Sequence, residues 1–143
     1  MPILRDPAGS LDLQIREGYH WTPTFLQLVD DAVDENGDPV PFPTGTTAYL
    51  TVRDEIGGTA ILSLGPVSAG LDGTLTVDAA AGMIEGDVAP LDTVGLAFPE
   101  DGSPGVYDLV IYPGGDATLA YVLVAGVVEY FRRATERPEV PSA

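Results

Sequence analysis

Apolar and polar residues alternate with a period of two along most of this chain, and breakers of Gly, Pro and Asp separate the alternating segments. The clearest example covers residues 47–53, where Ala48, Leu50 and Val52 form an apolar face. Successive side chains of a β-strand point to opposite faces of its sheet, so this pattern is typical of half-buried strands. The chain is therefore predicted to fold into β-structure.

About seven or eight short strands are predicted, spaced roughly 8–12 residues apart with turn signals between them. The expected strands cover residues 11–15, 25–29, 47–53, 59–64, 74–77, 82–88, 106–112 and 118–130. The last of these is apolar on both faces, which predicts a place inside its sheet. At most one short helical turn is expected, near residues 90–96, with Asp92 as its cap and Gly95 limiting its length.

This succession of strands favours an antiparallel β-sandwich, and a small closed barrel is the alternative. A length of 143 residues suits one domain, and an apolar content of 45% is enough for a core. We expect an N-terminal extension at residues 1–9, the β-sandwich domain at 10–131, and a charged, proline-containing C-terminal tail at 132–143.

The chain is strongly acidic, with 22 Asp and Glu against six basic residues and a formal net charge of −16. Such a surface repels phosphate backbones and anionic lipids, so neither a nucleic acid nor a membrane is an expected partner. No segment reaches the ~18 apolar residues that a membrane-spanning helix needs. Solubility, adaptation to a salt-rich or divalent-rich medium, and attraction of a basic partner remain alternative explanations of the acidity.

Side chains that exchange protons near neutral pH are scarce, because the chain has no Cys, no Lys and one histidine, His20. A histidine that acts as a general base needs an orienting carboxylate and a nucleophile nearby. The sequence places neither, so His20 is interpreted as a structural or surface residue. No enzymatic activity, catalytic residue or cofactor is predicted.

The acidic segment from Asp30 to Asp38 raises the question of calcium, since carboxylates are good calcium ligands. An EF-hand loop with Gly37 at its sixth position would begin at Ala32 and end at Pro43, and neither side chain can bind calcium. A looser calcium site in this segment stays possible, and a solvated acidic hairpin turn is the alternative. No residue is assigned as a metal ligand.

Two groups of aromatic residues are candidates for a protein interface. Tyr19 and Trp21 could form an exposed patch near the start of the chain, although core packing is the alternative role for Trp21. Near the other end, Tyr130, Phe131, Arg132 and Arg133 combine aromatic rings with arginine, which is the usual composition of interface anchors. A solvated tail is the alternative for this second group.

The order of these segments resembles that of small immunoglobulin-like β-sandwich proteins from the virions of tailed bacteriophages. The matching pieces lie within about residues 10–130: Glu17-Gly18 before an aromatic residue, the strand Ala48–Asp54, the turn Gly57–Thr59, and the late strand Gly105–Leu109. The layout is also similar to the N-terminal module of siphophage baseplate adaptor proteins. The resemblance implies an immunoglobulin-like sandwich and supplies no catalytic residues.

The resemblance also implies a non-enzymatic structural or adaptor role in a virion assembled in the host cytoplasm. The protein would dock on the tail tip, the baseplate or a fibre-attachment region, in several copies within a symmetric assembly of other phage structural proteins. A head decoration protein is the closest alternative. A carbohydrate-binding module, with Tyr19, Trp21 and Tyr49 as a stacking platform, is an alternative from a different class.

Overall fold

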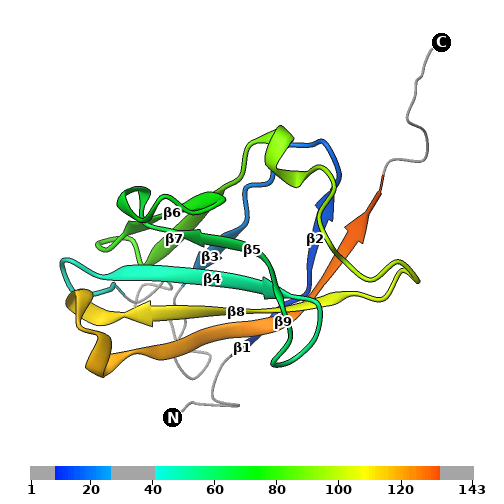
Figure 1. Ribbon diagram of the computed structural model, residues 1–143. Helices are drawn as coiled ribbons and strands as arrows, with labels where there is room; N and C mark the ends of the chain where they lie inside the picture. Colours follow the sequence, from blue (N-terminus) through cyan, green and yellow to red (C-terminus); the bar gives the residue numbers. More distant parts are fainter. Residues whose placement is uncertain (1–8, 27–40, 133–143) are drawn as a thin grey trace.

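The computed structural model of the protein describes residues 9–26 and 41–132, and these ranges form an all-β fold. Nine strands join in one mixed sheet that curls into a half-barrel (Figure 1). The strands are β1 (Gly9–Ser10), β2 (Leu13–Arg16), β3 (Thr24–Leu26), β4 (Thr47–Arg53), β5 (Ala60–Gly65), β6 (Gly73–Asp78), β7 (Met83–Asp87), β8 (Gly105–Tyr112) and β9 (Tyr121–Phe131).

The nine strands occupy eight positions, because β1 and β2 lie one after the other along the same edge of β9. Both pair with β9 in parallel and in one continuous register, with Gly9 facing Val124 and Leu13 facing Val128. The edge strand is interrupted at Leu11, whose carbonyl oxygen lies where a Cβ on Gly126 would stand. A glycine in β9 thus permits the close approach of this edge.

The sheet is mixed, so the prediction of a purely antiparallel sheet was wrong. Besides β1 and β2, the pair β5 and β6 is parallel, through the two pairs Leu64–Gly73 and Gly65–Thr74. Between them the chain passes through the 3-10 turn η2 (Val67–Ala69) and moves sideways by one strand position. Alternation determines which face of a strand is buried, but not which strand becomes its neighbour.

The structure confirms that the fold is all-β, but it does not show a clear sandwich. Strand pairing runs without a break in the order β1/β2, β9, β8, β4, β5, β6, β7, β3, so the sheet does not divide into two hydrogen-bonded sheets. By curling, it encloses one core. The apolar face predicted for residues 47–53 is confirmed, since Ala48, Leu50 and Val52 of β4 are buried. The alternate side chains Tyr107, Leu109 and Ile111 of β8 are buried as well.

A helical turn occurs in the predicted place as the 3-10 turn η3 (Pro90–Thr93). It begins with a proline at its first position, which suits the fixed φ of that residue, and it has no side-chain cap. Asp92 lies inside the turn, so its prediction as the cap was wrong. Three further 3-10 turns occur in the described ranges, namely η2, η4 (Pro113–Gly115) and η5 (Ala117–Leu119).

Strand β9 lies inside the sheet, between β8 and the edge formed by β1 and β2, as its apolar residues on both faces predicted. It begins later than predicted, because residues 117–119 form η5, where the Asp116 carboxylate accepts a hydrogen bond from the Thr118 backbone amide. Tyr107 of β8 pairs with Gly126 of β9 and donates a hydrogen bond of 2.5 Å to the Leu11 carbonyl. Its hydroxyl therefore ties β8 to the edge strand.

Candidate interface at the loop end of the sheet

Three segments that are distant in the sequence meet at one end of the sheet, which we call the loop end. They are residues 16–19 at and after the end of β2, residues 90–96 with the turn η3, and residues 130–132 at the end of β9. Parallel pairing sets Arg16 beside Phe131, and the Glu17 amide then donates to the Phe131 carbonyl at 2.9 Å. The Glu17 carboxylate accepts a hydrogen bond of 2.9 Å from the Gly95 amide, which joins the second segment to the first.

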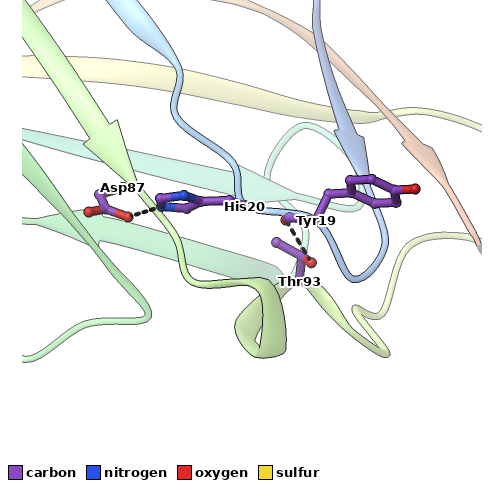
Figure 2. Close-up of polar contacts among 4 residues, drawn as sticks. All are labelled: Tyr19, His20, Asp87 and Thr93. Carbon is purple, nitrogen blue, oxygen red and sulfur yellow. Dashed lines mark hydrogen bonds and ion pairs between the residues drawn. The ribbon is translucent and has the colours of Figure 1, made fainter.

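Thr93 is fully buried and its hydroxyl holds the first two segments together. The hydroxyl oxygen accepts a hydrogen bond from the Gly18 amide at 2.8 Å. The hydroxyl proton has two carbonyl acceptors, that of Tyr19 at 3.3 Å (Figure 2) and that of Pro90 at 2.8 Å. Because a threonine with no exposed surface satisfies these backbone groups, the turn after β2 has a defined position on η3.

Tyr130 joins the third segment to the other two. Its hydroxyl donates to the Thr93 carbonyl at 2.6 Å and accepts from the Leu96 amide at 3.3 Å. Its ring stacks on Phe98, with centroids 4.6 Å apart and ring planes inclined by 15°. Burial is the main cause that raises the pKa of the Tyr130 hydroxyl. The side chain of this predicted interface residue thus contacts the protein's own loop.

Two arginines lie over aromatic rings at the loop end. The Arg132 guanidinium is 5.2 Å from the centroid of Tyr130 and donates to the Phe98 carbonyl at 3.0 Å. The Arg16 guanidinium is 5.3 Å from the centroid of Phe131. Such contacts attract a cation to the face of a ring, so both positive charges are held in place. In the described part of the chain the remaining arginine is Arg53, and Arg133 lies outside that part.

The same end exposes four large apolar side chains. The exposed fractions are 64% for Tyr19, 85% for Leu91, 39% for Val94 and 41% for Phe131. Exposed apolar side chains that gather at one end of a fold, together with arginines, are typical of a protein-interaction site. The sequence singled out Tyr19 and Phe131 for this surface but missed Leu91 and Val94. Both lie in or directly after a short helical turn, and local sequence does not say which face such a turn exposes.

Trp21 does not belong to this exposed surface. It is 8% exposed, packs in the core, and pairs through its backbone with Val88, with N–O distances of 3.1 and 2.9 Å. Tyr49 stands on β4 with its ring 5.2 Å from that of Tyr112. The structure therefore does not bring Trp21, Tyr19 and Tyr49 together as the stacking platform that a carbohydrate-binding module would need.

His20 has the carboxylate partner that the sequence could not place. Its Nε2 atom lies 2.5 Å from Oδ1 of Asp87, and both side chains are more than half exposed. The imidazole extends away from Thr93, whose hydroxyl is bonded to the backbone (Figure 2). The pair joins the turn after β2 to the end of β7. No local signal connects two residues so far apart in the sequence.

In residues 9–26 and 41–132, no group of three or more His, Asp or Glu side chains is arranged to hold a metal ion. The calcium hypothesis for Asp30–Asp38 concerns a segment outside the described residues. The same ranges contain no helix long and apolar enough to cross a membrane. No protein-family model matches the chain, and no curated protein matches it.

Proposed function

We propose that this protein is a non-enzymatic structural or adaptor component of a tailed-phage virion. It docks through the loop end on the tail tip, the baseplate or a fibre-attachment region. The resemblance in the order of its segments supports this proposal, and an immunoglobulin-like character of the β-domain is part of the proposal. The observation that carries the docking role is the loop end itself, where exposed apolar side chains stand beside two arginines held on aromatic rings.

The well-defined conformation of the loop end favours a docking role. The hydrogen bonds that Thr93 accepts from Gly18 and from Tyr130 hold the three segments of the loop end together. A preorganised surface loses less conformational entropy on binding, which strengthens the complex. Many copies on a symmetric assembly would add avidity, so each contact can be modest. The partner surface is expected to offer an apolar patch with carboxylates at its rim, matching the two arginines.

The test is a double variant, Leu91→Ser with Phe131→Ser, made in the phage that encodes the protein. Both side chains are exposed and neither side chain takes part in the hydrogen bonds of Thr93 or Tyr130, so the variant is expected to fold. We expect mass spectrometry of purified particles to find the protein missing. The matched control is Val67→Ser, which removes an apolar side chain that is 76% exposed in η2, away from the loop end.

Incorporation of the double variant at the normal level would contradict docking through the loop end. Absence of the unmodified protein from purified particles would contradict the virion role altogether. Antibody labelling of particles in the electron microscope separates the tail location from the alternative of head decoration.

A further inference from the structure

The outer face of the sheet, opposite the core, carries an open groove of about 400 Å³ over β4, β8 and β9. Its floor is formed mainly by the side chains of Val106, Ala125 and Val127, which are half-buried. The hairpin loop between β4 and β5 forms one rim, and there Ile56 is 89% exposed. A projecting apolar side chain thus stands beside an apolar groove on the same face.

The groove is also lined by one cation and one carboxylate, Arg53 and Asp108. Strand pairing sets Arg53 opposite Val106, and Asp108 opposite Thr51, so the two charges are diagonal neighbours on this face. The Arg53 guanidinium donates to the Gly58 carbonyl at 3.0 Å, which directs it toward the hairpin. No ion pair joins these two described residues, and each charge is available to a group that enters the groove.

We propose that a second copy of this chain covers the groove, related to the first by a two-fold axis. Ile56 of each copy occupies the groove of the other, and Arg53 of each copy faces Asp108 of the other. A two-fold contact must be self-complementary, and this face holds both halves of an apolar fit and both halves of a charge pair. The chain has a net charge of −16, so most of its surface would repel a second copy. On this face the arginine and the aspartate of one copy would instead meet the opposite charges of the other.

This proposal is independent of the docking role of the loop end, whose residues take no part in the groove. Its test needs only the purified full-length chain in solution. The association state is measured by sedimentation equilibrium at physiological ionic strength, where the long-range repulsion between two acidic chains is largely screened. We expect a reversible dimer.

Charge reversal distinguishes a second copy from any other occupant. Arg53→Glu alone, or Asp108→Arg alone, places like charges opposite each other twice across the axis, and each variant should weaken the dimer by at least about tenfold. An equimolar mixture of the two variants should dimerise again, because the glutamate introduced in one chain meets the arginine introduced in the other. The chain that carries both reversals should dimerise by itself. Far-ultraviolet circular dichroism verifies that each variant is folded.

The apolar half of the contact is tested by Ile56→Ser, which should weaken the dimer, against the control Val67→Ser, which should not. A monomeric wild-type chain would overturn the proposal, since another segment or another protein would then be the occupant. Single reversals that dimerise as well as the wild type would also overturn it. So would a mixture of the two reversals that stays monomeric while each variant is folded.

Discussion

Replacing Thr93 by valine tests whether a single buried hydroxyl holds the loop end together. Valine has nearly the same shape and fits the same space, but it offers no oxygen to the Gly18 amide and no proton to the Pro90 carbonyl. The change therefore removes two hydrogen bonds without opening a cavity. It leaves the partly buried Gly18 amide without its acceptor and the Pro90 carbonyl without its donor.

The magnitude follows from those unpaired groups. A buried donor left without its acceptor lowers stability by about 1–3 kcal/mol, and a partly buried donor such as the Gly18 amide lies toward the lower end of that range. Burial of the extra methyl group of valine offsets part of this loss of stability, by up to ~0.8 kcal/mol. We expect a net loss of about 1–2 kcal/mol, which for a chain of this length corresponds to a melting temperature lower by roughly 3–6 °C. In urea the midpoint should fall by about 0.5–1 M with an unchanged slope.

Two measurements decide the outcome. Urea unfolding gives the stability, and amide hydrogen exchange reports on the Gly18 amide directly. In Thr93→Val the Gly18 amide should exchange faster than in the wild type. In the control Thr93→Ser, which keeps the hydroxyl and loses only a methyl group, it should stay protected. Wild-type stability of Thr93→Val with a protected Gly18 amide would refute the assigned role of this hydroxyl.

Three further results are expected. Burial raises the pKa of the Tyr107 hydroxyl above its ordinary value of 10.0, and the charge of Asp12 adds to this shift. The stability that the protonated hydroxyl contributes is therefore complete below pH 10 and is lost as the pH rises above 10. Tyr107→Phe should accordingly make the alkaline loss of stability less steep, by up to ~1.4 kcal/mol per pH unit, and an unchanged slope would contradict this. Gly126→Ala should destabilise the fold by roughly 1–3 kcal/mol in urea, because its Cβ would stand on the Leu11 carbonyl, and a neutral effect would show that the edge strand moves freely. Trp21→Ala should lower stability by about 3–5 kcal/mol, as measured by thermal unfolding, and a loss below ~1 kcal/mol would argue against its core position.

Local pattern predicted the strands well where one face is buried and the other is not. In β4 the alternation of apolar and polar residues identified the buried face correctly, and β8 has the same alternating burial, since packing against one core imposes that period. The parallel pairings of β9 with β1 and β2, and of β5 with β6, had no such signal. They depend on which strands become neighbours, and that is decided by the whole chain. The curl of the sheet depends on the same choices.

At the candidate interface, too, the sequence identified some of the residues and missed others. Tyr19, Phe131 and Arg132 were singled out because aromatic and arginine residues are typical of interfaces, and the structure places all three at the loop end. Thr93 was missed, because a threonine in a proline-initiated turn looks like any loop residue until its hydrogen-bond partners are known. Trp21 was weighed between two roles, and only the position of its side chain in the core could decide between them.

The edge formed by β1 and β2 determines how late in synthesis the sheet can be completed. Its only hydrogen-bonded neighbour in the described sheet is β9, which is synthesised after the other described strands. The first strands synthesised must therefore wait, unpaired, for the last one. Contacts between such distant segments slow folding, because a long loop must close before they form. Truncated or stalled chains should expose an open strand edge and be prone to aggregation.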